Sequence, residues 1–171
     1  MSSLPDVLVR SVEGAARALA ARALSEELAY VISIGDPGER RPPGLDGHRA
    51  ALCRLEFHDI EDEAWREEGM FGATPRDAAE LVQFCRVIAE RPGTTLIHCS
   101  AGVSRSTASA LVLASVVLGP GSEKESVDRV FRWRPQAWPN ERFVGLADGV
   151  LGRGGAISRA LAARLEVEGL R

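Results

Sequence analysis

Four short hydrophobic runs in the first hundred residues predict β-strands. Each run is rich in Val, Ile, Leu or Ala and is bounded by charged residues, Gly or Pro, which is typical of short buried strands. The runs are DVLVR near residue 6, AYVISI at residues 29–34, residues 50–58 and residues 94–98.

Helical periodicity occupies two of the three intervals between these runs and nearly all of the chain after His98, whereas the turn IGDPGERRPPG separates the second run from the third. Residues 12–28 carry Ala and Leu at helical spacing, and a second helix is expected from Thr74, a good N-cap, to about Glu90. Four more helices, each bounded by Gly, Pro or Ser, are predicted at residues 105–118, 122–133, 140–151 and 157–168. Strands alternating with helices predict an α/β fold, with a central sheet of about four to five strands flanked by helices.

The composition narrows the class of protein. A chain of 171 residues with 45% hydrophobic and 26% charged residues fits a single globular domain over residues 1–171. A net charge of −3 gives no reason to expect a nucleic acid or an anionic membrane as partner. Charged residues interrupt the N-terminus, so no export signal is predicted. We therefore expect a cytoplasmic protein, and a monomer.

The cysteines indicate neither a disulfide framework nor a metal site. The chain has three of them, Cys53, Cys85 and Cys99, without a CxxC pair. An odd number without paired spacing argues against a structural disulfide set or a zinc knuckle. No metal and no cofactor are expected.

The segment HCSAGVSRS, from His98 to Ser106, has the pattern of an anion-binding loop. It lies between a predicted strand and a predicted helix, where the backbone N–H groups of a tight loop converge on one point. Gly102 allows the turn, and Arg105 offers a planar fork that can grip two phosphate oxygens. Cys99 would lie at the centre of the cradle, where amides, helix dipole and Arg105 favour a thiolate. A thiolate facing phosphorus is a nucleophile.

Cysteine with arginine six residues later is by itself a weak pattern, because 20 of the 21 basic residues are Arg. Cys85 is also followed by Arg at the sixth place, Arg91, but that stretch lies inside a predicted helix whose amides are already bonded. Cys53 has Asp59 at its sixth place. Only the loop that contains Cys99 combines the preceding strand, the glycine and the following helix.

These residues resemble the signature loop of the cysteine-dependent protein tyrosine phosphatase superfamily, in particular its compact dual-specificity branch and the small bacterial tyrosine phosphatases. RWRPQAWPNERF at residues 132–143 is similar to a pattern that follows the loop in that branch. The resemblance spans about residues 50–152. It implies a phosphatase fold, a phosphorylated protein as substrate and hydrolysis through a phosphocysteine.

The resemblance also assigns roles to individual residues. Cys99 would be the nucleophile, Arg105 the phosphate clamp, Ser106 a hydrogen-bond donor to the sulfur and His98 a support behind the thiolate. The backbone amides from Ser100 to Arg105, and so of Ser100, Ala101, Gly102, Val103 and Ser104, would bind the phosphate.

The general acid is expected on a loop upstream of the signature. Asp59 ends the strand LEFHD and matches the family position, while Asp62 stays an alternative because residues 60–73 resemble an insertion. An acid is needed there to protonate the leaving oxygen.

The substrate and two other classes of function stay open. Residues 100–104 carry no charge, which favours phosphotyrosine in a protein over a phosphoinositide, while phosphoserine and phosphothreonine remain possible. Trp65, Phe71 and Arg40 or Arg41 are candidates for the pocket entrance. A rhodanese-like sulfurtransferase and a catalytically silent phosphate-binding module are the alternatives to a phosphatase.

Overall fold

Four parallel strands form the central sheet. The structure is a computed structural model that describes residues 4–62 and 68–169. The strands lie in the order β1-β4-β2-β3, and their bounds are Val7–Arg10 (β1), Tyr30–Gly35 (β2), Ala51–Glu56 (β3) and Thr95–His98 (β4). Each coincides with one of the hydrophobic runs, so the predicted α/β fold with a small sheet is confirmed.

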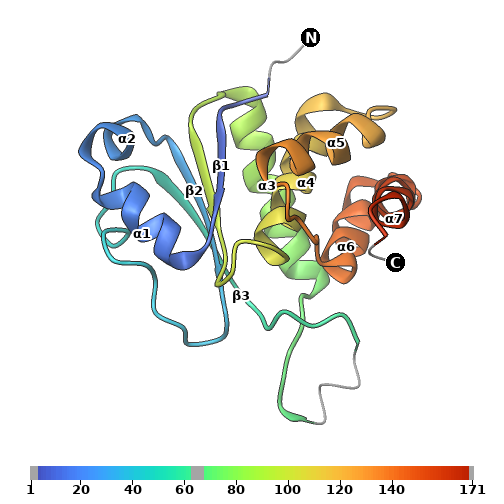
Figure 1. Cartoon of the computed structure of the whole chain (residues 1–171), viewed down its shortest axis with the longest axis horizontal. Helices are drawn as coiled ribbons and strands as arrows, with labels where there is room; N and C mark the ends of the chain where they lie inside the picture. The colour runs from blue at the N-terminus through green and yellow to red at the C-terminus, as the bar shows by residue number, and fades with distance from the viewer. Residues whose placement is uncertain (1–3, 63–67, 170–171) are drawn as a thin grey trace.

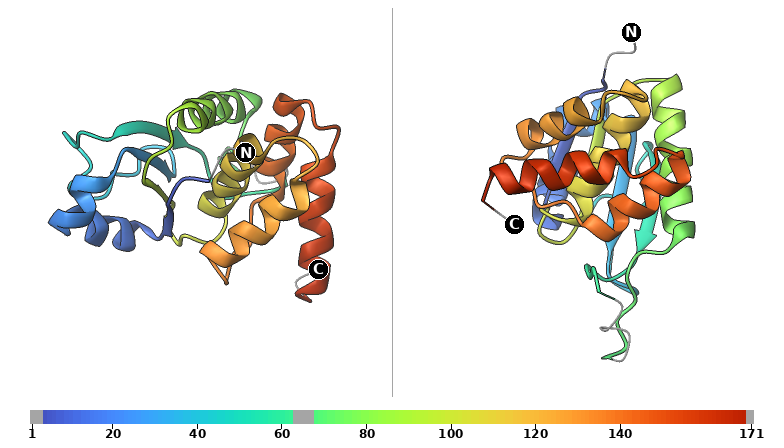
Figure 2. Two further views of the ribbon diagram at one scale, coloured as in Figure 1. Left: turned by 90° about the horizontal axis from the view of Figure 1, so that it is seen from above. Right: turned by 90° about the vertical axis from the view of Figure 1, so that its right-hand side faces the viewer.

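Helices cover both faces of the sheet in unequal layers (Figures 1 and 2). The thin layer and the thick layer each enclose a hydrophobic core. The thin layer consists of α1 (Val12–Ala20) and α2 (Arg22–Glu27). The thick layer consists of α3 (Pro75–Glu90), α4 (Arg105–Leu118), α5 (Glu123–Trp133), α6 (Glu141–Leu151) and α7 (Ala156–Val167), the last packed on α5 and α6.

The segment 12–28 differs from the expected continuous helix. It is divided at Ala21, whose φ of −76° and ψ of 100° are extended rather than helical. Helix α1 buries residues against the sheet, whereas α2 has no fully buried residue. After the break, Leu28 is buried in the same hydrophobic core as the apolar side chains of α1. Because neither Gly nor Pro marks this break, hydrophobic periodicity did not reveal it.

Helix α4 lies at the centre of the thick layer. It contacts α3, α5 and α6 as well as the sheet, and almost every one of its residues is buried. A helix enclosed on all sides must be apolar around its whole circumference, which explains the long uncharged stretch after Arg105. Nowhere in residues 4–62 and 68–169 is a helix both long and apolar enough to span a bilayer. The enclosed helix gives the loop at its N-terminus a rigid base.

The carboxyl ends of the strands all point to one edge of the sheet, because every pair of neighbouring strands is parallel. The chain leaves β2 at residue 36, β3 at residue 57 and β4 at residue 99. Segments that are far apart in the sequence therefore meet at this edge, which is where ligands bind in open α/β sheets.

A long segment between β3 and α3 projects from the body of the protein (Figure 1). Its two ends are held together at His58 and Phe71: the His58 N–H donates to the Phe71 carbonyl at 2.8 Å, and the Phe71 N–H donates to His58 Nδ1 at 2.9 Å. Helix α3 begins after it with the expected cap, in which Thr74 and Asp77 form a capping box. Trp65, a candidate for the pocket entrance, lies outside the described residues.

Candidate active site

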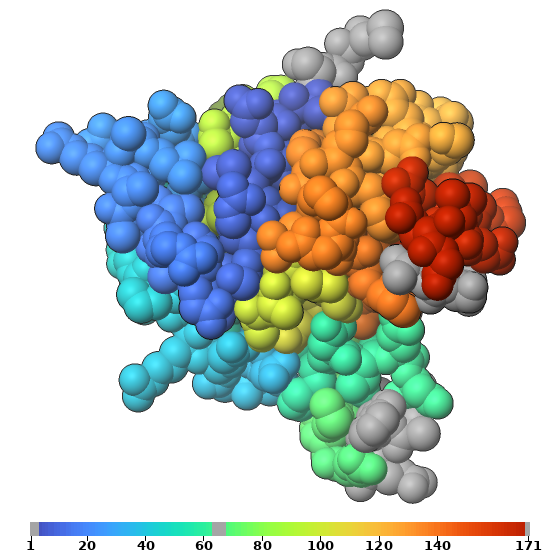
Figure 3. Space-filling view, viewed as in Figure 1, coloured from blue at the N-terminus to red at the C-terminus, as the bar shows by residue number. Residues whose placement is uncertain are grey.

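The loop from Cys99 to Ser104 packs tightly on the junction between β1 and α1. Gly102 has a φ of 70°, and a Cβ atom there would lie 2.4 Å from the backbone carbon of Arg10 and 2.5 Å from the nitrogen of Ser11. The Val12 N–H also donates to the Ser100 carbonyl at 3.1 Å. Glycine is thus required at position 102 both for its backbone conformation and for this close approach. Figure 3 shows the loop (yellow) at the surface between the blue α1 region and the orange segment after α5.

Cys99 lies at the start of this loop with its sulfur enclosed. The residue is 2% exposed. The Gly102 N–H donates to Sγ at 3.2 Å, and the Ser106 Oγ lies 3.2 Å from the same sulfur. Once the thiol has ionised, both groups can donate to the thiolate. The loop thus brings Cys99, Gly102 and Ser106 together.

Arg105 is fixed at the first position of α4 and is only 3% exposed. Its Nη1 donates to Asp36 Oδ1 at 2.7 Å and to the Phe57 carbonyl at 2.6 Å, and its Nη2 donates to Ser100 Oγ at 3.0 Å. Its Nε is buried and makes no hydrogen bond to any described residue. A buried donor without a partner costs about 1–3 kcal/mol, so this edge of the guanidinium is suited to receive an anion.

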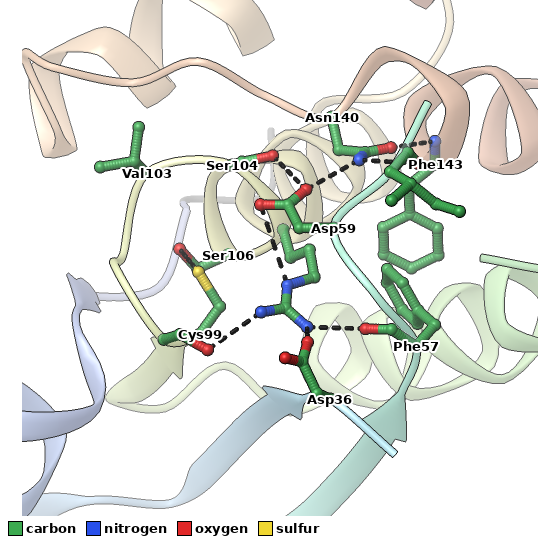
Figure 4. A network of polar contacts seen from close by, with 12 residues as sticks. Asp36, Phe57, Asp59, Cys99, Val103, Ser104, Ser106, Asn140 and Phe143 are labelled. Atoms are coloured by element: carbon green, nitrogen blue, oxygen red, sulfur yellow. Dashed lines mark hydrogen bonds and ion pairs between the residues drawn. The ribbon is translucent and has the colours of Figure 1, made fainter. Parts of the chain in front are cut away.

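Asp59 is held over the loop from two sides, as Figure 4 shows. Its Oδ1 accepts from Ser104 Oγ at 2.6 Å and from Asn140 Nδ2 at 2.9 Å, and its Oδ2 lies 3.9 Å from Arg105 Nε. Asn140 is itself buried and caps α6, because its Oδ1 accepts from the Phe143 N–H at 2.9 Å. The residue that starts α6 therefore also positions the carboxylate.

Asp59, the residue at the family position, accepts a hydrogen bond from Ser104 of the loop. Asp62, the alternative, lies three residues further along and lines the same hollow as Asp59, together with Glu61 and Met70. Of the other candidates for the entrance, Phe71 is exposed and Arg41 pairs with Asp46 at 3.0 Å.

The segment after α5 closes one side of the loop, which sequence reasoning did not foresee. Arg134 Nε donates to the Gly102 carbonyl at 2.9 Å, and the Trp138 N–H donates to the Val103 carbonyl at 2.9 Å. Arg134, Trp138 and Asn140 all lie in residues 132–143, the stretch that resembles the family pattern. Its spacing pointed to the family but gave no contacts.

The other two cysteines lie in the core between the sheet and α3. Burial raises the pKa of Cys53 to about 12 and raises that of Cys85 well above the usual value. Both are free thiols, and their burial leaves them protonated at neutral pH and unsuited to nucleophilic attack. In the described part of the chain, no three His, Cys, Asp or Glu side chains are grouped in a way that could hold a metal ion.

His98 lies behind Cys99 at the end of β4, enclosed by the sheet and 1% exposed. Neither ring nitrogen has a hydrogen-bond partner among the described residues. Burial, and next the nearby positive charge of Arg54, lower the pKa of His98 from 6.5 to about 4. The ring is thus neutral in the folded protein near pH 7.

This lowered pKa predicts a specific loss of stability in acid. The unfolded chain takes up the proton below pH 6.5 and the folded protein only near pH 4. The neutral His98 ring therefore costs the fold nothing above pH 6.5. As the pH falls from 6.5 to about 4, the free energy of unfolding should decrease by about 3 kcal/mol because only the unfolded chain binds the proton. Urea denaturation of His98→Phe between these pH values should give a flatter pH dependence than wild type. Equal slopes would contradict a neutral buried ring.

Comparisons with known proteins place the fold. No family model matches the chain, and no curated protein matches its sequence. Solved structures do match: human DUSP28, at 19% identity with a TM-score of 0.62, covers 89% of this chain and 95% of its own. The Yvh1 phosphatase domain from Chaetomium thermophilum, at 25% identity and a TM-score of 0.55, covers 92% and 96%. DUSP15, at 19% and 0.60, covers 96% and 95%. The chain has the fold of dual-specificity phosphatases, and the predicted likeness to the tyrosine phosphatase superfamily is confirmed at the level of the fold.

Proposed function

We propose that residues 1–171 form a single phosphatase domain that hydrolyses phosphoric monoesters on proteins, with phosphotyrosine as the preferred substrate. The observation that carries this proposal is the arrangement of three side chains at the loop from Cys99 to Ser104. They are the buried Cys99 sulfur, the buried Arg105 Nε, which makes no hydrogen bond to a described residue, and the Asp59 carboxyl group, which lies 3.9 Å from that nitrogen. These are a nucleophile, an anion clamp and a proton donor.

In the first step the thiolate of Cys99 attacks phosphorus. The S–P bond forms as the ester P–O bond breaks, and the leaving oxygen takes a proton from Asp59. Arg105 and the loop amides stabilise the charge on the equatorial phosphate oxygens, because backbone N–H groups at the N-terminus of a helix and a fixed guanidinium favour negative charge.

In the second step water cleaves the phosphocysteine. Asp59, now a carboxylate, accepts a proton from water as the water oxygen attacks phosphorus, and the S–P bond breaks. Ser106 donates a hydrogen bond to the departing thiolate, for which its Oγ already lies 3.2 Å from the sulfur. Inorganic phosphate leaves and the starting state returns. Neither step calls for a metal ion.

The preference for phosphotyrosine rests on the uncharged character of residues 100–104. A phosphoinositide headgroup carries further phosphates, for which cationic side chains in the loop would be suitable partners. Phosphoserine and phosphothreonine are shorter, and they are the first alternatives.

The test is hydrolysis of an aryl phosphate and of matched phosphotyrosine, phosphoserine and phosphothreonine peptides in the presence of EDTA. We expect turnover that the chelator does not change, highest on phosphotyrosine, and a phosphate trapped on the Cys99 peptide after acid quench. Binding of phosphate without hydrolysis would instead identify a binding module, and turnover of thiosulfate a sulfurtransferase. Faster hydrolysis of phosphoserine would overturn the tyrosine preference alone.

A further inference from the structure

The short turn that follows β2, residues 36–39, forms a polar link to the phosphate loop. The side chain of Glu39 folds back over its own turn, and its Oε2 accepts from the Asp36 N–H at 2.8 Å. The same oxygen accepts from Ser100 Oγ, in the phosphate loop, at 3.4 Å. One carboxylate oxygen thus joins two segments that are about sixty residues apart in the sequence.

These contacts close into a ring that contains Arg105. Its Nη2 donates to Ser100 Oγ at 3.0 Å, and its Nη1 donates to Asp36 Oδ1 at 2.7 Å. The ring therefore runs from Glu39 through Ser100, Arg105 and Asp36 back to Glu39. Both terminal nitrogens of the guanidinium are held by it, which fixes the plane of the group and leaves Nε directed elsewhere.

The turn is fixed from behind by Arg54 on β3. Arg54 Nη2 donates to the Glu39 carbonyl at 2.8 Å, and Nη1 donates to Ser33 Oγ on β2 at 3.0 Å. Gly35 leaves room for this arrangement, because a Cβ atom there would lie 2.5 Å from Arg54 Nη2 and 2.7 Å from Glu39 Oε2. The position of Glu39 is thus determined by the sheet and not by the phosphate loop it supports.

We propose that Glu39 is a positioning residue for the phosphate clamp. It acts through Ser100 and the Asp36 backbone to hold Arg105 with Nε facing the phosphate site, and it does not touch the substrate itself. Misplacement of a binding group by about 1 Å can cost 10²-fold in rate, so a support of this kind has a measurable effect. The expected effect on kcat/KM rests on the proposed function, whereas the expected effect on phosphate affinity requires only that the loop binds phosphate.

An effect of the Glu39 charge alone would change phosphate affinity in the opposite direction, so the direction of the change distinguishes the two roles. A carboxylate near Arg105 repels a phosphate, so if Glu39 acted only by its charge, its removal would tighten phosphate binding. If it positions Arg105, Glu39→Ala should weaken the binding of inorganic phosphate by about 10-fold and lower kcat/KM by a similar factor. Glu39→Gln keeps an acceptor oxygen without the charge and should restore most of both.

The experiment measures phosphate affinity by titration calorimetry and kcat/KM on an aryl phosphate for each variant. Glu26→Ala removes an exposed carboxylate on α2 and is the control for loss of charge, with both values expected at wild-type level. Ser100→Ala breaks the ring at the loop. The double variant Glu39→Ala with Ser100→Ala should bind phosphate no more weakly, and have a kcat/KM no lower, than the more strongly affected of the two single variants. Should Glu39→Ala fail to fold, Glu39→Asp is measured instead: it keeps the charge but draws the carboxylate away from Ser100, so it must bind phosphate more weakly than Glu39→Gln, and equal or tighter binding would overturn the positioning role.

Two results would overturn the positioning role: unchanged or tighter phosphate binding in Glu39→Ala, or fully additive losses in the double variant. Because phosphate binding needs no turnover, these results differ from failure of the proposed function. In that case wild type would bind phosphate and hydrolyse nothing, while the comparison between variants would remain valid.

Discussion

Replacement of Cys99 by Ser is expected to lower kcat/KM for an aryl phosphate by at least about 10⁴-fold, as loss of a covalent nucleophile does in other enzymes. A serine hydroxyl at this position is not ionised near neutral pH and is a far weaker nucleophile than a thiolate. The smaller hydroxyl fits the space, where the sulfur accepts from the Gly102 N–H. Phosphate affinity should therefore survive, and the variant should bind a phosphotyrosine peptide without hydrolysing it.

The chain supplies a matched control for this substitution. Cys85 also has an Arg six residues later, but it lies inside α3 and is fully buried in the core. Cys85→Ala should lower the melting temperature, because it leaves a cavity, and should keep kcat/KM within about twofold of wild type. If Cys99→Ser retained turnover in the same assay, the phosphocysteine pathway would be wrong.

Replacement of Asp59 by Asn is expected to lower kcat by about 10²- to 10⁴-fold, the usual contribution of a general acid. Asn can still accept from Ser104 and Asn140 through its carbonyl oxygen, so the loop should keep its geometry and its phosphate affinity. The proton for the leaving oxygen is lost, however. The loss in kcat/KM, which reports the first step, should thus be large for phosphotyrosine and small for an ester whose leaving group is a stable anion, such as nitrophenolate. The loss in kcat should appear with both esters, because hydrolysis of the phosphocysteine also uses Asp59.

Asp62→Asn is the matched comparison. Asp62 lies on the same projecting segment beside Glu61 and Met70, and its substitution should leave kcat close to the wild-type value. A larger loss in Asp62→Asn than in Asp59→Asn would transfer the acid role to Asp62. A loss in kcat/KM in Asp59→Asn that did not depend on the leaving group would indicate a structural role for Asp59 instead.

The part of the site that could be predicted from the sequence is the part that is local in the chain. Cys99, Gly102, Arg105 and Ser106 lie within eight consecutive residues. In such a short stretch between a strand and a helix, spacing alone determines which groups converge. The four strands were likewise predicted, because each is a short apolar run with clear boundaries. The break at Ala21 was not, since no residue type marks it.

The supports of the site could not be predicted in the same way. Asp36, Glu39 and the Phe57 carbonyl lie in connecting segments where charged residues are common and carry no pattern. Asn140 stood in a recognisable motif, yet its contact with Asp59 spans 81 positions. Such contacts depend on how the strands and helices are arranged in space, and hydrophobic periodicity does not specify that arrangement.

The sequence by itself therefore determined the α/β class, the strand positions and the chemistry of one loop, because local backbone geometry and hydrophobic burial act over a few residues. Tertiary structure decided which distant groups surround that loop. Parallel pairing in the order β1-β4-β2-β3 brings the ends of all four strands to one edge. There Asp36 and Phe57 hold Arg105 while Asn140 and Ser104 hold Asp59.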